Sequence, residues 1–155
     1  MDTLIMAKQR VAEMQLHSHR VNTVAASEDS LTEARVDEFC HGLEKQLGPA
    51  CELARRIWLL SELRLPQLRT IAATEAAAAD LVIVSVHHAE TLPPELRSWI
   101  DLWLPHRRKQ RSLLLALFDP VSSGVSAALR AHLEEVARRG RMEFLVQSED
   151  VPAVS

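Results

Sequence analysis

Five short apolar runs alternate along this chain with amphipathic stretches of helical periodicity, and few folds accommodate that alternation. The runs are Val21–Ala26, Cys51–Trp58, Leu81–Val86, Leu113–Phe118 and Met142–Val146. Strands that alternate with helices along a chain are typical of a parallel sheet covered by helices. The sequence therefore predicts an α/β fold, a three-layer sandwich with helices on both faces of a five-stranded parallel sheet.

Charged residues indicate which of these strands lie at the edges of the sheet. The second strand contains Glu52, Arg55 and Arg56, and the fifth contains Glu143. Charged side chains suit an edge strand, where they also discourage association between sheets. The third run is apolar at its centre, Leu81–Val84, and the fourth is apolar along its length, as expected of strands that are buried on both faces. With right-handed crossovers, these constraints favour the strand order 2-1-3-4-5.

The stretches between the runs carry signals for the starts and ends of helices. Ser30 and Glu33 match a capping box at the start of the first of these helices. Pro66 is a good residue for the first turn of the next helix. Thr91 is expected to cap the third helix, and Gly140 is expected to cap the end of the fourth.

The chain of 155 residues fits one domain. We assign this domain to residues 19–147. Residues 1–18 precede the alternation, and apolar residues recur there at three- and four-residue steps, so an arm or a short helix is expected. Residues 148–155 are expected to form a flexible tail.

Composition and charge exclude several classes of function. The net charge of -3 gives no reason to expect a nucleic-acid partner, and the basic run His106–Arg111 is expected to be a solvated loop. No apolar run is long enough to span a bilayer, and Asp2 stands where a signal peptide is basic. Cys40 and Cys51 fit no metal or redox spacing. The sequence therefore predicts a soluble, cytoplasmic protein, whose excess of arginine over lysine resembles a GC-rich bacterial coding bias.

Polar side chains follow the predicted strands at the points where those strands end. Ligands of such sheets bind beyond the carboxyl ends of the strands, so these side chains are candidates for lining a crevice. The candidates are Ser27, Glu28, Asp29, Ser85, His87, His88, Asp119, Ser122 and Ser123. The turn formed by Ser122 and Ser123 precedes a helix and is a candidate for binding an anion, although an ordinary helix cap is the simpler interpretation.

Three of the residues near the third strand are weak candidates for metal ligands or for acid–base groups. These are His87, His88 and Glu90, with Asp119 one strand away. Adjacent residues at a strand end point in opposite directions, so a site shared by both histidines is awkward. We therefore expect no bound metal.

The order of the elements resembles the flavodoxin-like group and, within it, the response-regulator receiver domains, over about residues 20–147. The resemblance implies an acidic Mg²⁺-binding pair directly after the first strand, a phosphorylated Asp after the third and a Lys after the fifth. Here Glu28 and Asp29 come late. The third strand ends at Val86-His87 without an aspartate, and the fifth ends at Val146-Gln147 without a lysine. A receiver-related chain with these residues has lost phosphotransfer.

No cofactor is expected. Flavodoxins hold the FMN phosphate in a Ser/Thr- and Gly-rich loop after the first strand. In this chain Ser27, Ser30 and Thr32 supply hydroxyls there, but no glycine is present, and Glu28 and Asp29 would repel a phosphate. The four glycines of the chain form no GxGxxG motif.

These observations favour a regulatory or protein-interaction module without catalytic activity. The alternative is a small enzyme or ligand-binding protein that uses the crevice, with metal assistance as one variant. A deep crevice lined by Asp29, His87 and Asp119 would favour the alternative, whereas a filled edge would favour the module.

The third predicted helix and its flanks are expected to contact a partner protein or a second copy of the chain. Leu102 and Leu104 fall outside the apolar stripe of this helix, so it is apolar over more than one face. Tryptophan in an apolar patch is typical of protein interfaces. The residues of this predicted contact surface are Leu92, Trp99, Leu102, Trp103 and Leu104.

Overall fold

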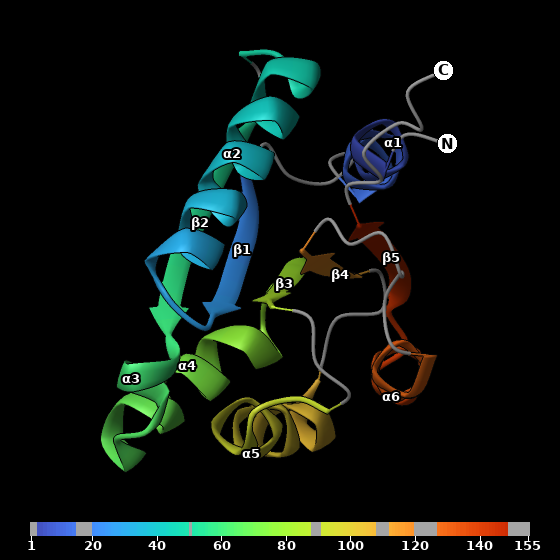
Figure 1. Cartoon of the computed structure of the whole chain (residues 1–155). Coiled ribbons are helices and arrows are strands. Elements are labelled where there is room, and N and C mark those ends of the chain that lie inside the picture. Colours follow the sequence, from blue (N-terminus) through green and yellow to red (C-terminus); the bar gives the residue numbers. More distant parts are fainter. Residues whose placement is uncertain are drawn as a thin grey trace.

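A parallel sheet forms the centre of the molecule (Figure 1). The computed structural model describes residues 3–14, 20–49, 51–87, 91–107, 112–119 and 127–148. The strands are β1 (Arg20–Ser27), β2 (Glu52–Leu59), β3 (Leu81–Val86), β4 (Leu113–Phe118) and β5 (Glu143–Ser148). Their order is β2-β1-β3-β4-β5, and all neighbours are parallel. The predicted α/β class and strand order are therefore confirmed.

Helices cover both faces of this sheet, as Figure 1 shows. The first face is covered by α1 (Thr3–Met14) and α2 (Ser30–Leu47). The second face is covered by α4 (Pro66–Ala77), α5 (Pro94–Trp103) and α6 (Ala127–Arg139), with the short α3 (Leu60–Leu63) and the 3₁₀ helix η2 (Leu104–His106) beside them. Within the described ranges, no helix combines the length and apolarity needed to cross a membrane.

Alternate side chains of the central strands fill the two layers between the sheet and the helices. In β3, Leu81 and Ile83 pack toward α1 and α2, whereas Val82 and Val84 pack toward α4, α5 and α6. Every residue of β3 and of β4 is buried. A strand that is apolar on both faces is held at the centre of a parallel sheet, so polar chemistry is confined to the strand ends.

The N-terminal helix α1 lies beside the C-terminal strand β5. The Thr3 hydroxyl donates to the Val146 carbonyl at 2.9 Å, and Arg10 pairs with Glu143 at the start of β5. The helix therefore runs antiparallel to β5 and covers the first face of the sheet, as a helix following β5 would. Ala7 is fully buried in this contact.

The N-terminal end of α2 differs from the predicted capping box. Asp29, rather than Ser30, is the N-cap residue. The Thr32 backbone N–H donates to the Asp29 carboxylate at 3.0 Å, and the Asp29 N–H donates to the Thr32 hydroxyl at 3.0 Å. The capping box is therefore formed one residue earlier than predicted, and Glu33 has no part in it.

Two other predicted caps are also corrected. The N-cap of α5 is Pro93 rather than Thr91. After α6, Arg141 takes the left-handed conformation (φ 56°) that a glycine usually adopts at a helix end. Gly140 meets a different requirement, because a Cβ atom there would lie 3.0 Å from Leu104 Cδ1. Glycine thus lets α6 approach η2 closely.

The predicted contact surface on α5 is largely buried. Leu92, Trp99, Trp103 and Leu104 are 3%, 0%, 0% and 7% exposed, and only Leu102 is open, at 43%. The two tryptophan rings pack edge to face with centroids 5.7 Å apart, inside the layer between the sheet and α5. Four of the five residues therefore belong to the core, and the prediction that they form a surface was wrong.

The basic run after α5 also departs from the expected solvated loop at its first arginine. Arg107 is partly buried and donates from Nη1 to the carbonyls of Ala76 at 2.7 Å and Ala79 at 3.0 Å. Its guanidinium lies over the Trp103 ring, 5.9 Å from the centroid. Burial lowers the pKa of this guanidinium. Arg107 thus caps the C-terminal end of α4, and residues 108–111 lie outside the described ranges.

We expect Val84→Asp to unfold the protein. Val84 is fully buried among apolar side chains, so an unpaired carboxylate there costs several kcal/mol, comparable with the ~5–15 kcal/mol that stabilises a typical domain. Urea unfolding followed by circular dichroism measures the loss. Gln67→Asp, at an exposed position in the first turn of α4, is the control and should change stability by less than about 0.5 kcal/mol. A Val84→Asp variant as stable as the wild type would contradict the burial of β3.

Candidate functional site

Three of the predicted side chains meet at the carboxyl edge of the sheet. Asp29 follows β1, His87 follows β3 and Asp119 follows β4. The Nε2 atom of His87 lies 2.7 Å from Asp29 Oδ2, and its Nδ1 atom lies 2.9 Å from Asp119 Oδ2. The prediction placed these residues near one edge, and the structure places them in direct contact.

Two further residues complete this arrangement, which we name the carboxyl-edge cluster: Asp29, His87, Asp119, Arg35 and Glu28. Arg35 Nη1 donates to Asp119 Oδ1 at 2.8 Å. The backbone N–H of His87 donates to Glu28 Oε1 at 3.0 Å. Glu28 was a predicted candidate, but Arg35 was missed. The sequence held one signal for Arg35, which lies in the second turn of α2, shortly after the acidic Glu28 and Asp29.

Both nitrogens of the His87 ring face carboxylates, and this arrangement favours the doubly protonated ring. An ionised carboxylate only accepts hydrogen bonds, and imidazole donates from both nitrogens only when it is charged. The hydrogen bond to Asp29 raises the pKa of His87, partial burial opposes that shift, and the bond to Asp119 adds to it. The pKa of Asp29 is lowered to about 2, first by the backbone N–H of Thr32 and then by His87.

Charges balance between the four side chains at the centre of the cluster. Arg35 is a cation, His87 is a cation when both of its ring nitrogens are protonated, and Asp29 and Asp119 are their carboxylate partners. The two fixed cations lie where a divalent metal ion would otherwise neutralise the carboxylates. Because both ring nitrogens of His87 are engaged, neither is available to ligate a metal or to accept a proton from a substrate.

The two predicted serines at the strand ends do not join the cluster. Ser85 is fully buried, and its hydroxyl donates to the Thr32 carbonyl at 2.9 Å. Ser27 is also fully buried, and its hydroxyl donates to the Trp58 carbonyl at 3.5 Å. These hydroxyls tie β3 to α2 and β1 to β2, so their role in the structure is to hold the elements that position the cluster.

Four predicted site residues lie outside the described residues: His88, Glu90, Ser122 and Ser123. Within the described ranges, no group of three or more His, Cys, Asp or Glu side chains has a geometry that could hold a metal ion. Cys40 and Cys51 are both free and buried, and burial raises the pKa of the Cys40 thiol to about 11.

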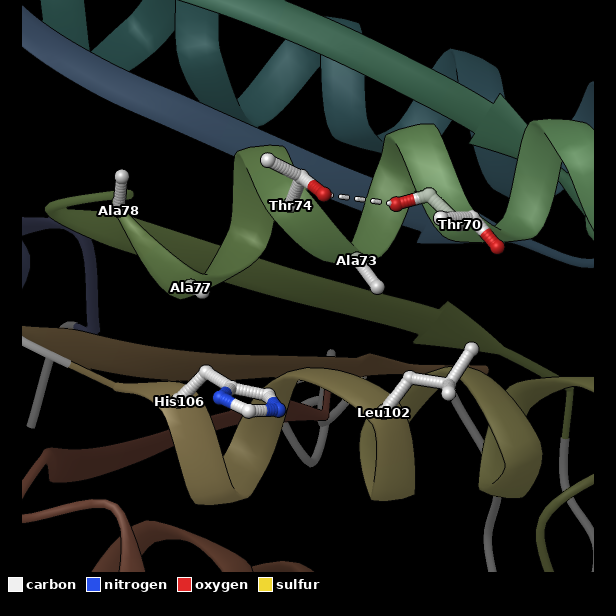
Figure 2. Close-up of a pocket in the computed structure, with 7 residues that line it drawn as sticks. All are labelled: Thr70, Ala73, Thr74, Ala77, Ala78, Leu102 and His106. Carbon is white, nitrogen blue, oxygen red and sulfur yellow. Dashed lines mark hydrogen bonds between the residues drawn. The ribbon is translucent and has the colours of Figure 1, made fainter.

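One cavity borders the cluster, and another lies between helices on the second face of the sheet. The first, of about 370 Å³, lies beside Arg35, and we name it the α1–α2 cavity. It is lined by Leu4, Arg35, Glu38, Phe39, His41, Gly42, Lys45, Leu117 and Gln147. The second, of about 500 Å³, is the α4–α5 groove, in which side chains of α4 face Leu102 and His106 (Figure 2). It is lined by Thr70, Ala73, Thr74, Ala77, Ala78, Leu102 and His106.

The chain matches no known family model and no curated protein, so its function has to be argued from the geometry of these sites.

The cluster is expected to contribute most to stability between about pH 4 and pH 6.5. Because the pKa of His87 is raised, its contribution is complete below the unfolded value of 6.5 and is lost as the pH rises through the higher folded value. Because the pKa of Asp29 is lowered to about 2, its contribution is present above the unfolded value of 3.8 and is lost as the pH falls toward 2.

We expect His87→Gln to lower the free energy of unfolding by about 1 kcal/mol at pH 6, a modest loss because the histidine is partly exposed. The loss should be smaller at pH 9, where His87 of the wild type is no longer charged. Urea unfolding of wild type and variant at both pH values measures the difference. His132→Gln, which changes an exposed histidine on α6, is the matched control and should have little effect at either pH. An equal loss for His87→Gln at the two pH values would mean that the charge on His87 contributes nothing.

Proposed function

We propose that this chain is a receiver-like domain without catalytic activity, which acts through contacts with other protein chains. The support is its flavodoxin-like strand order together with the residues that occupy the carboxyl edge. Glu28 and Asp29 follow β1 as an acidic pair, and His87 follows β3 where the resemblance to receivers calls for an aspartate. Glu28 and Asp29 contact His87 rather than an open site.

The engagement of both His87 ring nitrogens is the observation that carries this proposal. Asp29 bonds to His87 and also caps α2, and Asp119 bonds to His87 and Arg35. A catalytic site needs a nucleophile, base or metal ligand that is open to a substrate. In this cluster the titratable side chains bond to one another instead. These mutual contacts among the described residues are the support for an interaction module.

A metal ion is disfavoured at this edge by electrostatics. Mg²⁺ would have to approach within a few ångströms of the cations His87 and Arg35, and like charges about 4 Å apart repel by roughly 4 kcal/mol per pair of unit charges near a protein surface. The carboxylates that would repay this cost already accept hydrogen bonds from those two cations. Receiver phosphotransfer depends on Mg²⁺, so a cluster that disfavours Mg²⁺ also disfavours phosphotransfer.

With acetyl phosphate and Mg²⁺, the wild-type chain is expected to keep its unmodified intact mass.

Mn²⁺ at millimolar concentration is expected to leave the amide NMR signals of Asp29 and Asp119 sharp. His87→Asn removes one cation and leaves the carboxylates of Glu28, Asp29 and Asp119 close together, so Mn²⁺ should broaden these signals in the variant.

His132→Asn is the control for this metal experiment, because it removes a histidine from the exposed face of α6 and should behave as the wild type does. A stoichiometric phosphoryl adduct on the wild-type chain, or Mn²⁺ binding to the wild type as tight as to His87→Asn, would overturn the proposal that the edge is closed to phosphotransfer.

The α4–α5 groove is the surface that we propose for protein contacts, with a second copy of this chain as its occupant. A two-fold interface uses the same patch on both copies, so it needs a projecting side chain and a hollow on one face. Leu102 is 43% exposed and projects from α5. Ala73 and Ala77 line the facing side, where their small side chains leave room (Figure 2). On α4, Ile71 adds a second large apolar side chain, 47% exposed.

Light scattering on the wild-type protein at about 100 µM is expected to give the mass of a dimer, and Leu102→Glu is expected to give a monomer because it places a charge in the apolar contact. Ile5→Glu is the matched control, since Ile5 is 48% exposed on α1, away from the groove, and this variant should remain dimeric. A wild type that is monomeric at high micromolar concentration would exclude the homodimer.

A further inference from the structure

The strand β2 has one unpaired edge in the part of the chain that the structure describes. It is the outermost strand of the sheet and pairs only with β1. Alternate residues of a parallel strand turn their N–H and C=O groups to the same side, so about half of these groups in β2 face away from the sheet. An edge of this kind can pair with an extended segment of another chain.

Beside this edge, the second face of the sheet contains a cavity of about 510 Å³, which we name the β2 hollow. It lies over the amino-terminal halves of β1 and β2, where residues between Arg20 and Val24 and between Glu52 and Arg56 line it. From α4 only Glu75 and Ala78 contribute, because the helix ends beside this part of the sheet. The side chains of the edge strand are therefore left without a covering helix here.

The side chains of β2 that face the hollow form a charged row around a small residue. Arg56 faces α4, since its Nε atom lies 3.2 Å from Glu75 Oε2. Side chains two residues apart in a strand share a face, so Glu52, Ala54 and Arg56 lie in one row with about 7 Å between successive members. The two charged members are exposed. Asn22, the strand partner of Ala54 in β1, lies on the far side of the row.

This row defines what an added strand would have to carry. An antiparallel strand, the direction that is slightly more stable per residue, would place one side chain opposite each member. Opposite charges across a strand pair stabilise it and like charges destabilise it, so an acidic residue suits Arg56 and a basic residue suits Glu52. A large apolar residue opposite Ala54 can lean over that small side chain into the hollow, where Val24 and Ala78 contribute apolar lining.

A second copy of β2 meets only part of this requirement. It would supply Glu52 and Arg56 in the order that matches the charges. Ala54 would then stand opposite Ala54, and the hollow would stay empty. The charges and the hollow together therefore favour a segment of a different protein over a second copy of this chain.

We propose that β2 binds an extended segment of a partner protein as an added antiparallel strand. The segment carries an acidic, a large apolar and a basic residue at alternate positions, in that order. Main-chain hydrogen bonds hold it, the two charged pairs set its register and the apolar side chain fills the hollow. The proposal rests on the proposed function only in that it names a partner for an interaction module.

Blocked peptides test this proposal on the full chain by amide NMR titration. The probe, TETFTKT in one-letter code, carries the three required residues, with threonine, a good strand former, between them. TETATKT lacks the apolar side chain and TKTFTKT places a lysine opposite Arg56, so each should bind at least about threefold more weakly. Binding of TETFTKT should also slow hydrogen exchange in β2, because its outward N–H groups become bonded.

Three variants locate the added strand. Glu52→Lys should exchange the preference, so that TETFTET binds more tightly than TETFTKT. Ala54→Phe fills the hollow from the side of the protein and should remove the preference for TETFTKT over TETATKT. Glu38→Lys is the matched control, because it makes the same change of charge at an exposed position on α2, beside the α1–α2 cavity. This variant should keep the preferences of the wild type.

Thermal unfolding confirms that each variant is folded. The proposal is overturned if the folded wild type does not bind TETFTKT at about 5 mM, or if it binds TETATKT equally well. It is equally overturned if Glu52→Lys keeps the preference of the wild type. Protection of the outward amides of β2 before any peptide is added would mean that a second copy occupies this edge, and would also overturn it. Failure of the peptide to bind leaves the phosphate and metal experiments unaffected, and those test the proposed function separately.

Discussion

Burial of β3 and β4 on both faces is the constraint on which the rest of the structure depends. A strand in that position has no exposed face, so its side chains are apolar or, like Ser85, hydrogen-bonded, and its charged neighbours are displaced to the strand ends. In a parallel sheet those ends lie at one edge. Asp29, His87 and Asp119 are therefore brought together by the same topology that excludes charge from the core.

Carboxylates that gather at one edge of a sheet need a positive charge nearby. Unpaired carboxylates repel one another and would raise each other's pKa. Here the opposing charge comes from the chain itself, through the imidazolium of His87 and the guanidinium of Arg35. A cation that belongs to the chain stabilises one arrangement of the loops, whereas a dissociable metal ion would allow two. The cluster thus suits a domain that presents a constant surface.

The parts of this structure that were predictable from sequence depend on local patterns. The edge positions of β2 and β5 follow from Glu52 and Glu143, and the placement of His87 at one edge with its two aspartates follows from where the strands end, although their direct contact does not. The predicted capping box was wrong because two overlapping patterns compete, one that begins at Ser30 and one that begins at Asp29. Asp29 caps α2 in place of Ser30, and the same carboxylate also bonds to His87. That second bond is a tertiary contact, which no local pattern contains.

The features that sequence could not predict all depend on contacts between distant parts of the chain. The placement of α1 against β5 joins Thr3 to Val146, and hydrophobic periodicity indicates that a helix is amphipathic without indicating which surface it covers. That placement supplies Leu4 to the lining of the α1–α2 cavity. The helix α1 thus covers the part of the first face that lies beside β5. The lining of this cavity joins Leu4 of α1 to Gln147 of β5, so its formation is coupled to the folding of segments that are far apart in the sequence.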